Sequence, residues 1–229
     1  NVFISNESLS ITCDDKLIMS GITLSCSFSR MSDVIFVPEE IEREANKISV
    51  SFKRKYRSTY RELKYGIVEF EEVGSSLKVS LNALAGRYYF LAHGGAHICF
   101  TMPEGTTGAL ALDSMVPCWM NVSFPKKMDD MQESVDSLAF KANGLDVHVL
   151  PLCNDKTASR VSKDGLKISP RNNGAPEINS TVMCITAATD PYEAVHSSFV
   201  NMKDCGAITV PLAKDRKYPV ALEGLGWCT

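Results

Sequence analysis

Apolar and polar residues alternate along much of the first half of this chain, which is the pattern of strands that bury one face. The clearest run is Ile22, Leu24, Cys26 and Phe28, with a polar residue between each pair, and residues 47–52 repeat the pattern. Successive side chains on a strand point to opposite faces, so a period of two indicates a half-buried strand. Such runs recur about every ten residues with turn residues between them, as in β-sandwiches. We therefore predict an all-β fold, a large β-sandwich.

Turn residues between the apolar runs predict where the strands reverse. Asp14-Asp15 lies between two short runs, and Gly74-Ser75-Ser76 separates two longer ones, so both are expected to form hairpins. The Gly-rich residues 93–95 predict a further turn. The run that begins at Val34 is expected to end at Pro38, with residues 39–46 in a loop or one helical turn.

One junction predicts the start of a helix. The strongly apolar residues 181–189 lead directly into Asp190-Pro191-Tyr192-Glu193. Asp190 can cap the first free amides, Pro191 suits the first helical position, and Glu193 can complete a capping box. The helix is expected to end at Cys205-Gly206.

The predicted helix carries one apolar stripe. Tyr192, Val195, Phe199 and Met202 are spaced so that they fall on one side. We expect this stripe to lie on the sandwich.

Composition excludes some partners and leaves others open. The 229 residues carry a formal charge of −3 and a pI of about 5.9, so the chain lacks the basic field that nucleic-acid binding requires. The basic residues 53–57 are interpreted as a solvated strand edge or loop. No apolar run approaches the roughly 20 residues of a spanning helix, so no membrane partner is expected.

The eight cysteines are widely spaced and form no C-x-x-C motif, so we predict no structural metal site. Most lie inside apolar runs, as Cys99 and Cys184 do, where a thiol behaves as a small core residue. We interpret them as free, buried thiols, although the even count also permits disulfides.

The sequence offers few candidates for catalytic residues. The acidic pairs, such as Asp129-Asp130, lie in predicted turns and are interpreted as loop charges. His93 and His97 lie four residues apart around a double glycine, which favours a turn over a metal site, and His148 is predicted to face solvent. Nucleophile elbows and phosphate-binding loops are absent from the sequence. The sequence therefore predicts no catalytic residue, no metal ligand and no cofactor.

Trp119 and Trp227 are the only tryptophans. Sugar rings present apolar faces that stack on aromatic side chains, so these two residues are the candidates for substrate binding. The alternative interpretation is that each is a large core side chain.

Several motifs in the second half of the chain resemble one enzyme family. They are Gly226-Trp227-Cys228-Thr229, the run at residues 115–120 with the polar segment that follows it, the strand at residues 145–152, and Asp190-Pro191-Tyr192 at the start of a helix. In their order along the chain they resemble the N-terminal domain of glycoside hydrolase family 36 proteins of the raffinose synthase, seed imbibition protein and alkaline α-galactosidase type. The plant members often have two tryptophans and a flanking arginine where this chain has Trp119 alone.

The resemblance implies a fold and a role. It implies a supersandwich of the galactose mutarotase-like type over residues 1–212, with one C-terminal helix. It also implies that residues 213–229 are a linker and the first strand of a missing (β/α)8 barrel. The catalytic carboxylates of that family lie on later barrel strands, so this chain alone is expected to be inactive. The implied partner is an α-galactosyl oligosaccharide, bound through the barrel with a loop lent by Gly94-Gly95 or by residues 125–130.

A second hypothesis is a stand-alone carbohydrate-binding sandwich. In that case residues 221–229 should pair as an ordinary strand of the sandwich, whereas in a truncated enzyme they should project from it. The sequence is compatible with a homo-oligomer, with a periplasmic, secreted or cytoplasmic location, and with a hydrolase or a transferase as the parent.

Overall fold

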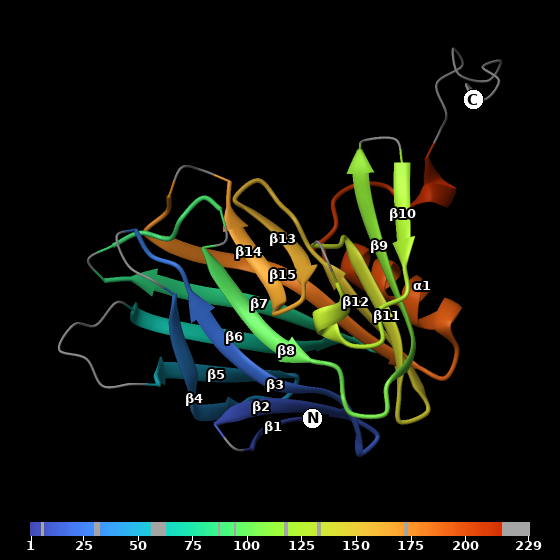
Figure 1. Ribbon diagram of the computed structural model, residues 1–229, viewed down its shortest axis with the longest axis horizontal. Coiled ribbons are helices and arrows are strands. Elements are labelled where there is room, and N and C mark those ends of the chain that lie inside the picture. The colour runs from blue at the N-terminus through green and yellow to red at the C-terminus, as the bar shows by residue number, and fades with distance from the viewer. Residues whose placement is uncertain are drawn as a thin grey trace, which may run out of the picture.

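The computed structural model describes residues 1–5, 7–29, 33–55, 63–86, 88–93, 95–116, 119–131, 134–171 and 174–216. Within these residues the chain forms strands over most of its length and one α-helix (Figure 1). The first strands are β1 (Val2–Ser5), β2 (Ser8–Cys13), β3 (Lys16–Cys26), β4 (Val34–Arg43), β5 (Lys47–Arg54), β6 (Leu63–Val73), β7 (Ser76–Ala85) and β8 (Ala96–Thr101). The remaining strands are β9 (Thr107–Val116), β10 (Trp119–Ser123), β11 (Ser137–Ala142), β12 (Leu145–Pro151), β13 (Thr157–Ser162), β14 (Gly165–Pro170) and β15 (Glu177–Ala188). The helices are α1 (Pro191–Asp204) and the short 3₁₀ helices η1 (Met128–Asp130) and η2 (Ala213–Asp215).

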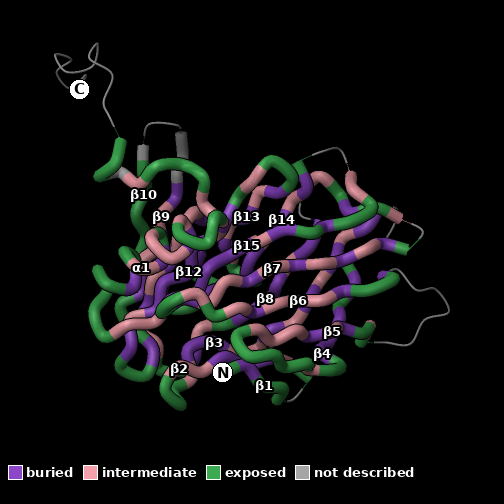
Figure 2. Tube along the Cα trace, turned by 180° about the vertical axis from the view of Figure 1, so that it is seen from behind, coloured by how far each residue is buried: buried purple, intermediate pink, exposed green. Residues whose placement is uncertain are grey.

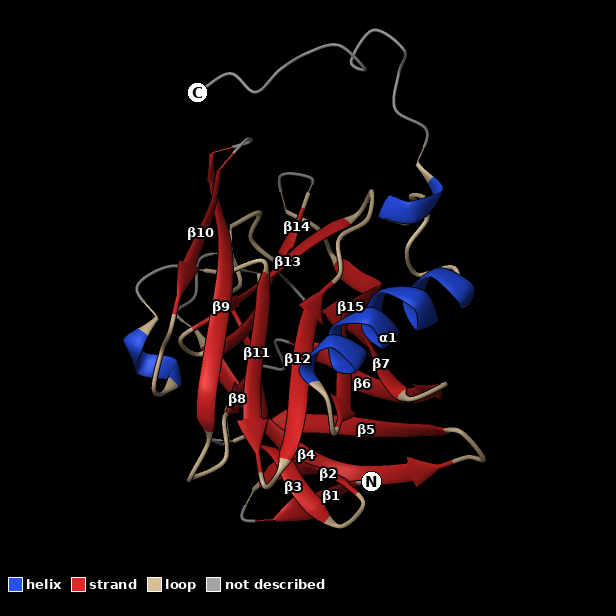
Figure 3. Ribbon diagram, turned by 90° about the vertical axis from the view of Figure 1, so that its right-hand side faces the viewer, coloured by secondary structure: helices blue, strands red, loops and turns tan. Residues whose placement is uncertain are grey.

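The strands form one antiparallel sheet that folds over on itself. Its order is β10-β9-β11-β12-β15-β7-β6-β5-β4-β3-β8-β14-β13, with β2 paired to β3 and β1 paired to β2. The part that contains β8, β14 and β13 lies over the part that contains β7, β15 and β12, which makes two layers (Figures 1 and 3). The predicted β-sandwich with one C-terminal helix is confirmed.

The two layers are joined where the ends of the sheet approach each other. Val135, just before β11, pairs with Val161 of β13 through two backbone hydrogen bonds of 2.7 and 2.9 Å. β13, the last strand in the sheet order, is thereby hydrogen-bonded to the segment before β11, which lies near the other end of that order.

Two predicted hairpins are confirmed. Asp14 and Asp15 both have positive φ, 48° and 61°, and join Cys13 to Lys16 as a two-residue turn. Aspartate tolerates this left-handed backbone better than most residues do, and paired positive φ values suit the twist of a hairpin. The turn after β6 is also two residues long, because Ser76 belongs to β7 and pairs with Val73.

The prediction that a strand ends at Pro38 is wrong, since β4 continues through it to Arg43. β4 pairs with β3 only as far as Phe36, while its pairing with β5 continues with a register shift just after Pro38. Beyond Phe36 one side of β4 is a sheet edge. A proline lacks the N–H donor, and an edge or a bulge is where a sheet tolerates that loss.

The apolar run at residues 115–120 includes the end of one strand and the start of the next, and residues 117 and 118 between them lie outside the described part of the chain. β9 ends at Val116, and β10 begins at Trp119 and runs back along it, with a register shift after Trp119. Both arms of this hairpin are apolar near the turn, so the sequence shows one continuous run.

The core lies between the two layers (Figure 2). Its largest fully buried side chains include Phe28, Phe70, Phe90 and Phe100, and the rings of Phe28 and Phe90 have centroids 5.3 Å apart. Phe70 of β6 and Phe100 of β8 alternate with more exposed neighbours along their strands. In these two strands the period-two pattern therefore predicted the side that faces the core.

The cysteines of the described residues are free thiols. Cys26 and Cys184 are buried as expected, and Cys13 and Cys99 are half-buried. Cys153 and Cys205 are exposed, so the prediction of a buried thiol does not hold for them. Burial raises the pKa of the Cys26 and Cys184 thiols, which keeps both in the uncharged form.

Candidate functional site

Helix α1 begins where the sequence predicted. The Oδ1 atom of Asp190 accepts a hydrogen bond of 2.9 Å from the backbone N–H of Glu193, and Pro191 is the first helical residue. This bond is one half of the predicted capping box. The helix ends at Asp204, and Gly206 follows with a φ of +78°.

The side of α1 that faces the sheet is not the predicted one. Ala194, Ser198 and Met202 are its buried residues. Of the expected stripe only Met202 is buried, whereas Tyr192, Val195 and Phe199 are 84%, 37% and 39% exposed. The helix therefore turns its large apolar residues outward.

A buried hydrogen-bond network explains this orientation. The Oγ atom of Ser198 lies 2.8 Å from Nδ1 of His148, from Oγ1 of Thr186 and from the carbonyl oxygen of Ala194. On the other side of the ring, Nε2 of His148 lies 2.8 Å from Oγ of Ser137. Buried polar groups must find partners, so Ser198 has to face the sheet, where His148 and Thr186 are.

His148 was predicted to face solvent and is only 2% exposed. The prediction fails because α1 covers the outer face of β12, so side chains on both faces of this strand are buried. Burial lowers the pKa of His148 to about 4. The ring is neutral at neutral pH, with one N–H donor and one acceptor nitrogen for its two hydroxyl partners.

An apolar groove runs along the outward face of α1. Its volume is about 1590 Å³, and one wall is formed by Tyr192, Val195 and Phe199. The other lining residues come from the end of β12 and its following loop, with Leu150 and Leu152, and from residues 206–212 with Lys214 and Arg216. Figure 3 shows α1 lying along the sheet beside the segment that leads to the last described residues. Polar residues gather at the rim, including Asn154, Asp155, Lys214 and Arg216.

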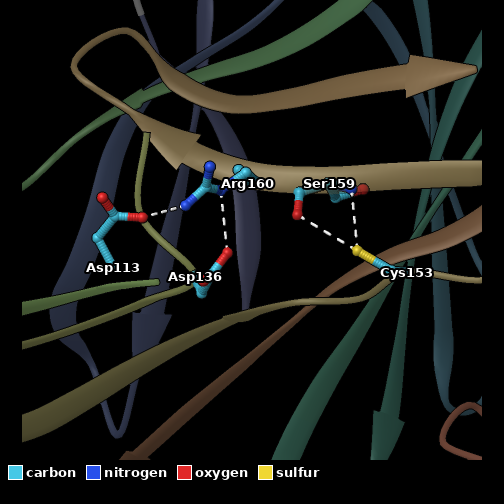
Figure 4. Close-up of polar contacts among 5 residues, drawn as sticks. All are labelled: Asp113, Asp136, Cys153, Ser159 and Arg160. Atoms are coloured by element: carbon cyan, nitrogen blue, oxygen red, sulfur yellow. Dashed lines mark hydrogen bonds and ion pairs between the residues drawn. The ribbon is translucent and has the colours of Figure 1, made fainter. Parts of the chain in front are cut away.

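The polar residues nearest the layer junction form an ion-pair cluster. Arg160 of β13 pairs with Asp113 of β9, and its Nε atom lies 2.9 Å from Oδ1 of Asp136 (Figure 4). Asp113 is buried and Asp136 is half-buried. A guanidinium that faces two carboxylates suits an electrostatic clamp between the layers.

The exposed Cys153 lies at the edge of the groove and is held in place by β13. Its Sγ atom lies 3.3 Å from the backbone nitrogen and 3.5 Å from the backbone oxygen of Ser159 (Figure 4). The next residue, Asn154, accepts hydrogen bonds of 2.9 Å from the backbone N–H groups of Lys156 and Thr157. The loop after β12 is thus fixed on the groove's border.

Of the two candidate substrate-binding tryptophans, the structure describes only the backbone of Trp119. Trp119 opens the edge strand β10 and pairs through its backbone with Val116. Trp227 lies outside the described residues. Their role in sugar binding stays a prediction.

The two histidines around the glycine turn do not form a metal site with the described residues. His93 is exposed, whereas His97 is half-buried on β8, where burial and the nearby Lys167 lower its pKa. Across the described part of the chain, the His, Cys, Asp and Glu side chains form no group of three that could hold a metal ion. Within the same residues, none of the helices has the length and apolar character needed to cross a membrane.

The loop predicted to lend residues to a barrel, at 125–130, borders a second hollow of about 340 Å³. Its lining carries both charge signs, with Lys126, Lys127 and Lys163 near Glu104 and Asp129. Gly94 of the other suggested loop lies outside the described residues.

Sequence reasoning missed the outward face of α1. The available signal was the spacing of small residues, because Ala194 and Ser198 lie four apart and continue to Met202. Small side chains allow a helix to approach a sheet closely. The larger apolar side chains beside these small residues then fit only on the face of α1 that points away from the sheet.

Comparison with known proteins shows the fold. No family model matches the sequence, and no curated protein sequence matches it either. Among solved structures, the chain is similar to a glycoside hydrolase family 97 enzyme from Pseudoalteromonas sp. strain K8, solved as a variant in complex with panose. The TM-score is 0.52 at 14% sequence identity. The likeness covers 82% of this chain but 34% of the enzyme, so the chain spans about a third of that enzyme's length.

Proposed function

We propose that this chain is a non-catalytic N-terminal β-sandwich domain of a glycoside hydrolase-like protein. More specifically, the parent protein is of the family 36 raffinose synthase type. A (β/α)8 domain that follows the sandwich acts on α-galactosyl oligosaccharides. The parent would be a retaining hydrolase or a galactosyltransferase.

The observation that carries the proposal is the fold. A large folded-over sheet with one helix after its last strand is similar to about a third of a much longer glycoside hydrolase. The sequence motifs near Asp190 and Gly226 support the family 36 form, and the family 97 likeness supports only the coarser one.

The groove on α1 is consistent with a domain that packs against another. Its large apolar side chains are available for packing against a neighbouring domain, and apolar grooves of this kind serve as interaction sites. Tyr192 and Phe199 are aromatic, a residue type enriched in interfaces.

The test compares the chain alone with the product of its whole reading frame. We expect residues 1–229 to hydrolyse neither nitrophenyl α-galactoside nor nitrophenyl α-glucoside, because the catalytic carboxylates belong to the following domain. The longer protein should hydrolyse the galactoside or transfer galactose to sucrose.

Three outcomes are informative. Activity on the α-glucoside alone would keep the link to glycoside hydrolases and overturn the family 36 assignment. A folded longer protein that hydrolyses neither glycoside and transfers no galactosyl group from the galactoside to sucrose would contradict the proposal. So would a reading frame that contains no barrel domain after Thr229.

A stand-alone carbohydrate-binding module is the second candidate, and one feature favours it. Met120 of the edge strand β10 is 61% exposed, and Phe124, which directly follows this strand, is 73% exposed. An exposed aromatic beside an unpaired strand edge can stack on a sugar. Binding of the isolated chain to a glycan array, lost in Phe124→Ala and kept in Tyr89→Ala, would favour this function.

A further inference from the structure

Helix α1 lies across the outer face of β12 and β15 (Figure 3) and packs there through a small apolar cluster. Its buried residues are Ala194, Ser198 and Met202, and only Met202 has a large apolar side chain. Met202 clusters with Leu150 and Cys184, and this cluster is separate from the core between the two layers. Burial of apolar area is the main favourable term in packing. Little of that area therefore holds α1 on the sheet.

A row of hydroxyl and amide groups joins the helix to the sheet as well. The Oγ1 atom of Thr186 lies 2.8 Å from Oγ of Ser198 and 2.7 Å from Oγ of Ser76. Asn201 donates a hydrogen bond of 2.9 Å from Nδ2 to Oγ of Ser76. With the ring of His148 these groups form one continuous network under the helix. Its bonds to the sheet last only while α1 is in place, because Ser198 and Asn201 belong to the helix.

The strands beside His148 offer its ring uncharged partners. Its two nitrogens lie against the hydroxyls of Ser137 and Ser198. The carboxylate of β12 belongs to Asp146, two residues before the histidine, and it pairs with Lys141 of β11 at 3.1 Å. The charge of Asp146 is thus already compensated.

The other elements packed on the ring also leave a protonated imidazole without a counter-ion among the described residues. β15 brings the Cys184 thiol, 3.5 Å from Oγ1 of Thr186, and burial raises the pKa of that thiol. Its other titratable residue, Glu177, is exposed at the first position of the strand. The titratable side chains of α1 occupy exposed or half-buried positions, at Tyr192, Glu193, His196, Lys203 and Asp204. A charge on His148 would therefore be buried and unpaired, which is costly.

We propose that α1 is a latch over the outer face of β12 and β15, which opens when His148 takes up a proton while the two layers of the sandwich stay folded. Opening lets water solvate the imidazolium and uncovers the Cys184 thiol. A free segment of 14 residues is marginal as a helix in water, so α1 unfolds as it leaves the sheet. The latch is independent of the proposed function, because it requires neither a following domain nor a sugar.

The pKa of His148 determines the size of the effect. Burial lowers this pKa to about 4, and opening restores the ordinary value of about 6.5. Between these values the open state binds more protons than the closed one, so acid favours opening. From pH 7.5 to pH 4.5 the opening equilibrium should increase roughly 70-fold.

Two buried thiols report separately on the latch and on the sandwich. Cys184 lies under α1, whereas Cys26 of β3 lies in the core between the layers, and both are 0% exposed. Residues 1–229 are labelled at pH 7.5 and 4.5 with 4,4′-dithiodipyridine, which reacts with thiols even in acid. Pepsin digestion and mass spectrometry then give the labelling rate of each thiol relative to free cysteine at the same pH.

We expect the relative rate of Cys184 to increase roughly 70-fold from pH 7.5 to pH 4.5. At pH 4.5 it should exceed the rate of Cys26 at least about tenfold, because local opening is more frequent than unfolding of the whole domain.

Three variants separate the latch from other causes. His148→Gln keeps an amide that can donate and accept a hydrogen bond but takes up no proton, so the increase in acid should disappear. Ser198→Ala removes one bond of the latch, and Cys184 should then label at least about fivefold faster at pH 7.5, with Cys26 unchanged. The matched control is His97→Gln on β8, which removes another histidine whose pKa is lowered by burial. It should leave the increase at Cys184 intact.

The proposal is overturned if Cys184 and Cys26 label at the same rate in acid, since the whole domain would then be unfolding. A relative rate of Cys184 that is equal at the two pH values would also overturn it. So would an increase that persists in His148→Gln, because another group would then be the trigger.

Discussion

At the scale of single residues, His148 shows how a polar group can determine the orientation of a helix. Its two ring nitrogens lie 2.8 Å from the hydroxyls of Ser137 and Ser198, and the ring is almost completely buried. An unsatisfied polar group at this site would cost about 1–3 kcal/mol. That cost favours the orientation in which Ser198 faces inward, although it leaves Tyr192 and Phe199 exposed.

The pKa of His148 predicts a loss of stability in mild acid. The folded chain binds a proton at His148 only near pH 4, whereas the unfolded chain binds it near pH 6.5. The unfolded state therefore holds more protons between these values, and the free energy of unfolding falls as the pH drops from 6.5 to 4, by up to about 3 kcal/mol. Urea denaturation at pH 7.5 and 4.5 measures this difference.

The variant His148→Leu tests the assignment. It should reduce the pH dependence and cost about 1–2 kcal/mol at pH 7.5, because two hydroxyls lose a partner. Some dependence should remain, since the pKa of His97 is also lowered by burial. His93→Leu changes an exposed histidine and serves as the control. An unchanged pH profile in His148→Leu would show that another group is responsible.

Arg160 is expected to contribute to stability as a clamp between the layers. Replacing it with Met removes the partner of the buried Asp113 and should cost about 1–2 kcal/mol, less than for a fully buried pair because Arg160 itself is 40% exposed. Lys53→Met breaks the exposed pair with Glu39, in which both side chains are more than half exposed, and should cost less than about 1 kcal/mol. Chemical denaturation of both variants gives the comparison. Equal losses would indicate that Arg160 has no clamp role.

At the scale of elements, the packing of α1 on the sheet and of the β13–β14 hairpin on β8 both require a close approach of two backbones. Ala194 and Ser198 let the helix lie close to the sheet. In the hairpin, Gly165 has a φ of +119° and pairs with Cys99 of β8. A Cβ atom there would lie 2.4 Å from the carbonyl oxygen of Ile98. Neither approach tolerates a larger residue.

Gly165→Ala should therefore be strongly destabilising. We expect about 2–4 kcal/mol, since both the backbone strain and the clash with β8 must be relieved. Gly105→Ala is the matched control, because Gly105 has a φ of +81° but no atom within 4 Å of the added Cβ. It should cost only about 1–2 kcal/mol of strain. Similar losses in the two variants, measured by urea denaturation, would contradict the close contact with β8.

At the scale of the whole molecule, the sandwich is held by its core. Four phenylalanines are fully buried between the layers, and the ends of the sheet are joined at Val135 and Val161. The six thiols of the described residues are free. The stability of the domain is thus assigned to apolar burial and strand pairing.

This assignment predicts that reducing agents and chelators have no effect. The midpoint of thermal unfolding should change by less than about 1 °C with dithiothreitol or with EDTA, because the thiols of the described residues are free and the side chains of those residues form no metal-binding group. Differential scanning fluorimetry with and without each reagent measures it. A drop with EDTA would reveal a metal site, and a drop with dithiothreitol would reveal a disulfide.

The sequence by itself determined the local features of this protein. Alternation at Ile22 to Phe28 predicted a strand and its buried face, Asp14-Asp15 predicted a tight turn, and Asp190-Pro191 predicted the first residue of α1. Each of these features depends on the conformational preferences of a few residues that are adjacent in the sequence.

Only the tertiary structure decided which surfaces meet. His148 was expected outside and lies inside, and Tyr192, Val195 and Phe199 were expected inside and lie outside. Both outcomes follow from α1 covering β12, with Ser198 bonded to a residue 50 positions away in the chain. Periodicity shows that a helix has an apolar side. Which side is buried depends on partners that are distant in sequence and adjacent only after folding.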